Sequence, residues 1–133
     1  MAVRATARRR EGYAHDVEVS GHSFVVDEPE ASGGQDQGPS PTRLVGAALA
    51  ACTAITVEMY ASRKGWELGQ VETDVDIEYD GATPSSFTVT LRLECELDDE
   101  QLERLRVIAG KCPVHRALAS ETPVAIEDRV ERV

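Results

Sequence analysis

A long apolar segment built from small residues constrains the fold of this chain more than any other feature. It starts at Ser40-Pro41, where Ser suits a helix N-cap and Pro the first helical position. It ends at Arg63-Lys64-Gly65, with cations in the last turn followed by a glycine stop. These signals predict a helix of about 24 residues, roughly 36 Å long at 1.5 Å per residue.

The middle of this helix, LVGAALAACTAITV, is apolar on almost every side. A helix of this kind is buried by other elements rather than lying on a surface, and its Ala and Gly positions allow close approach. The most hydrophobic stretch, Leu44 to Val57, is shorter than the about 20 apolar residues of a bilayer span. The arginine-rich start is followed by no apolar region typical of a secretory signal. We therefore expect a soluble, cytoplasmic protein without a membrane partner.

Alternating hydrophobicity predicts two pairs of strands. Val71 to Asp80 and Phe87 to Leu97 each place apolar residues on one face, which predicts two long antiparallel strands with one solvated side. Tyr13 to Val19 and Phe24 to Val26 are shorter, and Ser20-Gly21-His22-Ser23 between them predicts a hairpin turn.

The C-terminal third predicts further short elements. Asp98 with Gln101 indicates a capping box for a helix that runs to about Ala109. Pro113 to about Ala119 predicts another helical stretch, and Pro123 to Val130 a closing strand. Together these patterns indicate an α+β fold, in which antiparallel sheet packs against a long, buried central helix.

Length and charge narrow the organisation and the partners. A chain of 133 residues fits one domain over 1–133, and the polar residues 1–11 are expected to form a flexible tail. The formal net charge is −10. Such a charge repels phosphate backbones and anionic membrane surfaces, so nucleic acid is not expected as a partner.

The three cysteines differ in their surroundings. An odd, small number does not make a disulfide scaffold, and in a reducing compartment a cysteine pair indicates redox or metal chemistry. Cys95 falls on the apolar face of a predicted strand and is interpreted as a buried hydrophobic residue. Cys52 lies at the centre of the buried helix, in an apolar stripe with Leu49, Ile55 and Met59. That stripe alone predicts a raised thiol pKa and an inert cysteine.

Cys112 stands in a different setting, the segment Lys111-Cys112-Pro113-Val114-His115-Arg116. Pro113 suits the first position of a helix, so Cys112 is expected at the N-cap. There, free backbone N–H groups and nearby cations would lower its thiol pKa. An alternative is a metal site formed by Cys52, Cys112 and His115. No paired CxxC or HxxxH motif completes that site, and no metal ligand is predicted.

Four segments together resemble the OsmC/Ohr family. They are Gly38 to Pro41 (GPSP), Ala47 to Thr53 (AALAACT), Tyr60 to Trp66 (YASRKGW) and Lys111 to Arg116 (KCPVHR). The similarity is closest to the small branch of the family with a CPVH second-cysteine motif. It extends in matching order from about Val25 through Ile126.

The resemblance implies an intertwined homodimer that reduces organic hydroperoxides without a cofactor. Cys52 is then similar to the peroxidatic cysteine, whose thiolate is oxidised to sulfenic acid, and Cys112 to the resolving cysteine that forms the disulfide. An external thiol or dithiol would restore both. The apolar stripe of Leu49, Ile55 and Met59 would suit the alkyl part of a peroxide.

One departure from the family pattern concerns thiol activation. Peroxidase members carry a Glu just after the Pro that starts the central helix, and this Glu orients an N-terminal Arg. Here Thr42 and Arg43 occupy those positions. Arg10 is the best candidate for the N-terminal Arg, ahead of Arg8 and Arg9, and Arg43 could act on substrate across a dimer. The departure also favours an alternative, in which a non-catalytic relative binds a lipid or other small apolar molecule in the dimer groove.

Overall fold

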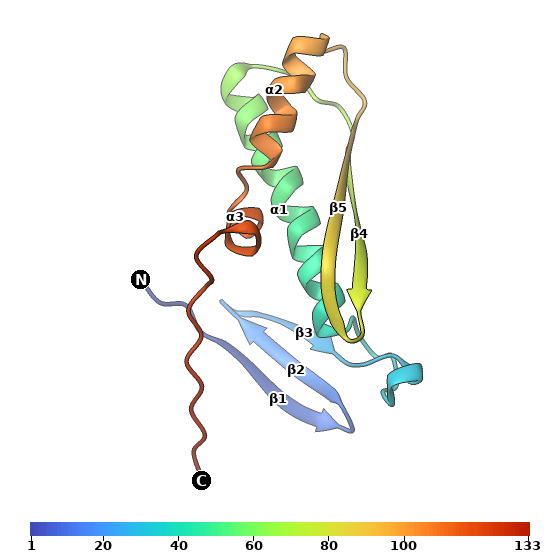
Figure 1. The fold of residues 1–133 in the computed structure, drawn as a ribbon, viewed down its shortest axis with the longest axis vertical. Helices are drawn as coiled ribbons and strands as arrows, with labels where there is room; N and C mark the ends of the chain where they lie inside the picture. The colour runs from blue at the N-terminus through green and yellow to red at the C-terminus, as the bar shows by residue number, and fades with distance from the viewer. The chain divides into compact units, whose positions relative to one another are not determined.

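The computed structural model describes residues 1–133 and has an α+β fold (Figure 1). Its elements in chain order are β1 (Ala5–Glu11), β2 (Ala14–Val19), β3 (His22–Val26), the short 3-10 helix η1 (Glu30–Ser32), α1 (Pro41–Lys64), β4 (Val71–Asp80), β5 (Thr83–Leu93), α2 (Asp99–Ala109) and α3 (Pro113–Ala119). Strands β1, β2 and β3 form one antiparallel sheet, and β4 and β5 form a second, two-stranded one.

The chain forms two compact units, each assembled from separate segments. One unit contains Met1–Ala47 and Asp76–Phe87, and the other contains Ala48–Val75 and Thr88–Val133. Helix α1 and the β4–β5 hairpin contribute to both units, because the boundary falls within them. A single domain over residues 1–133 stays a prediction.

The first unit begins with the three-stranded sheet. Ser20 and Gly21 close the β2–β3 hairpin with φ of 50° and 80°. Positive φ at both central residues is typical of the two-residue turn that matches strand twist. The predicted four-residue connection is therefore too long, and β3 already starts at His22.

Strand β1 corrects the expectation that residues 1–11 form a flexible tail. Residues Ala5–Glu11 pair with β2, with Ala5 opposite Val19 and Arg8 opposite Asp16. The side chains of this strand are almost all exposed, so its order comes from backbone hydrogen bonds rather than from apolar burial. Charged side chains are usual on an edge strand, because they discourage pairing with further chains.

A buried carboxylate organises the loop that leads into α1. Asp27 is 1% exposed and accepts backbone N–H groups from Glu28 at 2.7 Å and from Gln35 and Gln37 at 3.2 Å. Burial raises the pKa of Asp27, but these three hydrogen bonds outweigh it and leave the pKa below its ordinary value. The carboxylate thus fixes the loop as an ion with its oxygens satisfied.

The second unit has its own apolar core. Val57 and Ala61 of α1, Leu68 in the connection to β4, and Leu105 of α2 are buried together. Helix α1 ends at Gly65 (φ 71°), and the Trp66 N–H donates to the Ala61 carbonyl at 2.9 Å. This glycine-terminated cap confirms the predicted helix end, and the structure gives α1 the predicted bounds. The Asp98–Gln101 capping box of α2 is also confirmed.

Helix α1 is less buried within one chain than its sequence predicts. Leu49, Val57 and Ala61 are buried, but Ile55 and Met59 are each 53% exposed. By length and composition α1 could cross a membrane, and 28% of its most apolar window is buried. The core helix of a soluble protein passes the same length and composition test.

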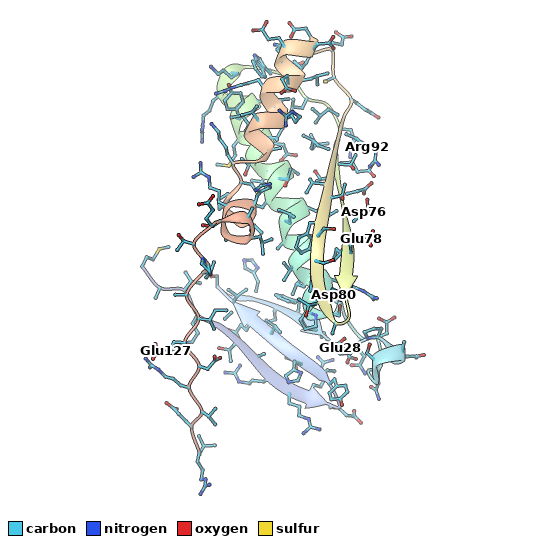
Figure 2. All side chains as sticks on the ribbon, in the orientation of Figure 1. Glu28, Asp76, Glu78, Asp80, Arg92 and Glu127 are labelled. Carbon is cyan, nitrogen blue, oxygen red and sulfur yellow. The ribbon has the colours of Figure 1, made fainter.

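Strand β4 keeps the predicted alternation between an apolar and a solvated face. Asp76, Glu78 and Asp80 project from its exposed side (Figure 2). Arg92 on β5 forms ion pairs with Asp74 and, at 3.9 Å, with Glu72. These surface charges account for part of the net negative charge of the chain.

The end of the chain differs from its prediction. Strand β5 stops at Leu93 rather than Leu97, and no strand forms over Pro123 to Val130. Val124 and Ile126 are exposed there. A strand needs a neighbouring edge for its backbone hydrogen bonds, and this segment pairs with none in the single chain.

Candidate functional site

The structure brings two of the cysteines together in the second unit. Cys52 lies in the middle of α1, and Cys112 is the N-cap of α3, as predicted. Cys52 lies close enough to raise the pKa of the Cys112 thiol, and Thr53, the next residue after Cys52, lies 3.9 Å from the Cys112 sulfur. Both cysteines are free thiols, Cys112 being buried and Cys52 half-buried. Two thiols so placed are chemically able to exchange between dithiol and disulfide.

Two further groups contact the Cys112 sulfur. The His115 backbone N–H donates to Sγ at 3.2 Å, which is the N-cap contact of α3. The Thr53 hydroxyl lies 3.9 Å from the same sulfur. Cys112 is therefore held between a buried residue of α1 and the first turn of α3.

The pKa of the Cys112 thiol is raised, contrary to the prediction from its flanking cations. Burial is the largest cause, and the neighbouring Cys52 also raises the pKa. The hydrogen bond from the His115 N–H and the interaction with the Thr53 hydroxyl act in the opposite direction but do not compensate. The sequence suggested cations and a helix terminus, but the full burial of the sulfur depends on residues far away in the chain.

A pocket of about 560 Å³ in the second unit is lined by two neighbours of Cys112 but by neither cysteine of the pair. Thr53 and His115, which both contact Cys112, form part of its wall. The rest of the wall is mostly apolar and comes from β5 and α2: Val89, Thr90, Leu91, Leu93, Leu102, Leu105, Arg106, Ala109 and Gly110.

The apolar residues proposed for substrate binding divide between core and surface. Leu49 is buried, and its carbonyl accepts a hydrogen bond from the Thr53 hydroxyl at 2.9 Å. Ile55 and Met59 lie on the exposed side of α1. Within one chain they therefore do not share a single pocket.

Arg10, the candidate activating residue, and Thr42 and Arg43, which replace the family's Glu, have other partners or face solvent. Arg10 forms a two-bond ion pair with Asp16, 2.6 Å at its shortest. Thr42 is hydrogen bonded to the Tyr79 hydroxyl at 2.9 Å, and Arg43 is exposed. All of these residues belong to the first unit.

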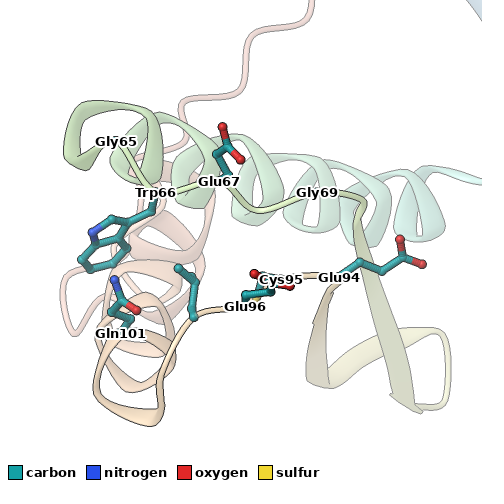
Figure 3. Close-up of a pocket in the computed structure, with 9 residues that line it drawn as sticks. Gly65, Trp66, Glu67, Gly69, Glu94, Cys95, Glu96 and Gln101 are labelled. Carbon is teal, nitrogen blue, oxygen red and sulfur yellow. The ribbon is translucent and has the colours of Figure 1, made fainter.

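Cys95 lies apart from the cysteine pair. It is half-buried in the irregular segment after β5, and lines a different pocket of about 720 Å³ with Trp66 and Gln101 (Figure 3). No group of three or more His, Cys, Asp or Glu residues is placed to hold a metal ion. The alternative metal site of Cys52, Cys112 and His115 therefore has no ligand set.

Thr53 is a residue of this site that the sequence analysis did not single out. It is 1% exposed, and it contacts both Leu49 and Cys112. A signal was present, since Thr53 is a polar residue directly after Cys52 in a run of apolar ones. Its contact with Cys112, 59 residues away, could not be read from local spacing.

Comparison with known proteins places the chain in a family. The model of the OsmC-like protein family matches residues 34–127, which includes both cysteines of the pair. The chain belongs to the OsmC-like family. No match is found among curated proteins.

Several solved structures share this fold at low sequence identity. An OsmC-like protein from Mycoplasma pneumoniae is 15% identical, with a TM-score of 0.79 over 91% of this chain and 89% of that one. The organic hydroperoxide resistance protein OsmC from Legionella pneumophila is 20% identical, with a TM-score of 0.66 over 92% and 93%. The organic hydroperoxide resistance protein OhrB of Bacillus subtilis is 24% identical, with a TM-score of 0.63 over 92% and 94%.

Membership of the OsmC-like family also bears on α1. Proteins of this family are soluble, and the long apolar helix is the central helix of their fold. Nothing therefore points to a membrane, although the helix passes the length and composition test.

Proposed function

We propose that this protein is a thiol-dependent peroxidase that reduces organic hydroperoxides. The observation that carries the proposal is the proximity of two free thiols within one unit: Thr53, which follows Cys52 on α1, lies 3.9 Å from the Cys112 sulfur, and Cys52 itself raises the pKa of Cys112. Family membership and the names of structural neighbours, which include organic hydroperoxide resistance proteins, support the same substrate class.

In the proposed reaction the Cys52 thiolate attacks one peroxide oxygen. The O–O bond breaks, the alkoxide takes up a proton and leaves as an alcohol, and Cys52 becomes a sulfenic acid. The Cys112 thiolate then attacks the Cys52 sulfur and displaces hydroxide, which leaves as water after protonation. An external thiol or dithiol reduces the resulting disulfide by exchange and is itself oxidised. No cofactor is needed, and we place the reaction in the cytoplasm.

Residues from two chains complete the proposed site. Ile55 and Met59 would line an apolar groove for the alkyl part of the peroxide once a second copy covers α1, with Leu49 behind them. Arg10 is the proposed counter-charge for the Cys52 thiolate. In that role Arg10 would leave its ion pair with Asp16 and pair with the thiolate instead. Arg43 would contact substrate from the partner chain.

A second candidate is a non-catalytic protein that binds a lipid or other apolar molecule in the same groove. Two observations favour it: the raised pKa of the Cys112 thiol, and the engagement of Arg10 by Asp16. The first disfavours the Cys112 thiolate, and the second pairs Arg10 with a carboxylate instead of a thiol.

Thiol counting after addition of one equivalent of cumene hydroperoxide separates the two candidates. The wild type should fall from three free thiols per chain to one, with a Cys52–Cys112 disulfide identified by peptide mass spectrometry. Cys52→Ser should keep its thiols, and Cys112→Ser should oxidise at Cys52 without forming the intramolecular disulfide. Cys95→Ser is the matched control and should still form it. If the folded wild type keeps all three thiols, the peroxidase proposal fails and the binding protein is the better account.

A further inference from the structure

The Thr53 hydroxyl lies between two acceptors and has a single hydrogen to give. It donates to the Leu49 carbonyl at 2.9 Å, one helical turn earlier, and lies 3.9 Å from the Cys112 sulfur. Because a hydroxyl carries one hydrogen and two lone pairs, only a lone pair faces Cys112 while Leu49 is the acceptor. In this arrangement the Cys112 S–H donates to Thr53.

Deprotonation of Cys112 changes what that sulfur needs. A thiolate has no hydrogen to donate, and the His115 N–H is its only backbone donor among the contacts at this position. Rotation of the Thr53 hydroxyl turns its hydrogen from the Leu49 carbonyl to the thiolate. The Leu49 carbonyl loses little, because in an α-helix it also accepts the backbone N–H of residue 53.

We propose that Thr53 is a positioning residue whose hydroxyl serves both protonation states of Cys112, accepting from the thiol and donating to the thiolate. The proposal rests on the resolving role proposed above for Cys112, but its core concerns ionisation of the thiol alone. It assigns to Thr53 the stabilisation of the thiolate that attacks the oxidised Cys52.

The surroundings of Cys112 offer its thiolate little other stabilisation than this hydrogen bond. The sulfur is fully buried, so water does not solvate the thiolate. Cys52 on α1 is the titratable group that acts on it electrostatically, and a negative charge there opposes a second one. Within α3, His115 contributes its backbone N–H rather than its ring. Thr53 is thus one of two hydrogen-bond donors available to the thiolate.

The test is a pH titration of the protein labelled with ¹³Cβ-cysteine, followed by NMR without any peroxide. The three cysteine signals are assigned with Cys52→Ser, Cys95→Ser and Cys112→Ser. Thr53→Val keeps the branched shape and removes the hydroxyl, and Thr53→Ser keeps the hydroxyl. Thr56→Val, which removes a hydroxyl less than one turn further along α1, is the matched control.

Thr53→Val should move the Cys112 titration midpoint to higher pH and reduce the thiolate fraction near neutral pH roughly tenfold, the effect of one hydrogen bond to a charged group. Thr53→Ser should restore the wild-type midpoint, and Thr56→Val should leave it unchanged. Thr53→Ala provides a second hydroxyl-free variant if Thr53→Val does not fold. An unchanged or lower midpoint in a folded hydroxyl-free variant would overturn the proposal. Because no peroxide is present, the titration tests the role of Thr53 even if the peroxidase proposal fails.

Discussion

At the scale of single residues, the two most buried ionisable groups of the chain have opposite perturbations. Asp27 has a lowered pKa because three backbone N–H groups favour its charged form. Cys112 has a raised pKa because its burial is complete and Cys52 raises it further, while fewer groups favour its thiolate. The number of hydrogen bonds to the charged form decides between these outcomes.

The Asp27 carboxylate makes the folded state sensitive to acid. Its pKa is lower in the folded than in the unfolded chain, so its stabilising contribution is present above the unfolded value and is lost as pH falls through the folded one. We expect Asp27→Asn to lower the melting temperature by several degrees at pH 7. The difference from wild type should shrink as pH falls below about 4.

Differential scanning calorimetry between pH 3 and pH 7 measures this difference. Asp36→Asn is the control. Asp36 lies in the same loop, but the loop's backbone N–H groups donate to Asp27, so this variant should follow wild type. A constant gap between Asp27→Asn and wild type over the whole range would contradict the role of the ionised carboxylate.

At the scale of elements, Gly69 holds the connection between α1 and β4 against the segment after β5. Its φ is 66°, and an added Cβ would lie 2.2 Å from the Glu94 carbonyl oxygen. Gly81 has a similar φ of 62°, but an added Cβ there would meet nothing within 4 Å. Substitutions at these two glycines therefore distinguish the cost of a left-handed backbone conformation from the cost of a steric collision.

Gly81→Ala should lower the free energy of unfolding by about 1–2 kcal/mol, the usual cost of this conformation for an L-residue. Gly69→Ala should cost at least about 1 kcal/mol more, because the backbone of Glu94 must also move. Urea unfolding of both variants measures the difference. Equal losses would show that the chain relaxes around residue 69 without penalty.

The sequence predicted the elements whose signals are local. Helix α1 carries its start at Ser40-Pro41 and its stop at Gly65, and α2 carries its capping box, so both were found with their bounds. Strand β1 was missed because its order comes from pairing with β2, and its own residues are mostly charged. The direction of the Cys112 pKa was missed for the same reason: burial is set by residues distant in the sequence.

At the scale of the whole molecule, the exposed side of α1 is the feature that a single chain leaves unexplained. Ile55 and Met59 place apolar surface in solvent, and Val124 and Ile126 near the C-terminus do the same. Exposed apolar patches of this kind are typical of interaction surfaces. They agree with the proposed homodimer, in which a second copy would cover α1.

Acidic substitutions on the exposed side of α1 should dissociate the proposed dimer. We expect Ile55→Glu, and more strongly Ile55→Glu with Met59→Glu, to shift the protein from dimer to monomer in sedimentation equilibrium at micromolar concentration. Arg63→Glu, an exposed change near the end of the same helix, should stay dimeric. A monomeric wild type, or a dimer unaffected by the double change, would remove the proposed groove between chains.

The position of Cys95 also has a practical consequence. It lines its own pocket with Trp66 and does not belong to the Cys52–Cys112 pair. A maleimide fluorophore added while Cys52 and Cys112 are joined in the proposed disulfide would react at Cys95 alone, and reduction would then free the pair. Each labelled molecule would then carry an optical reporter in the pocket that Trp66 also lines, away from the cysteine pair.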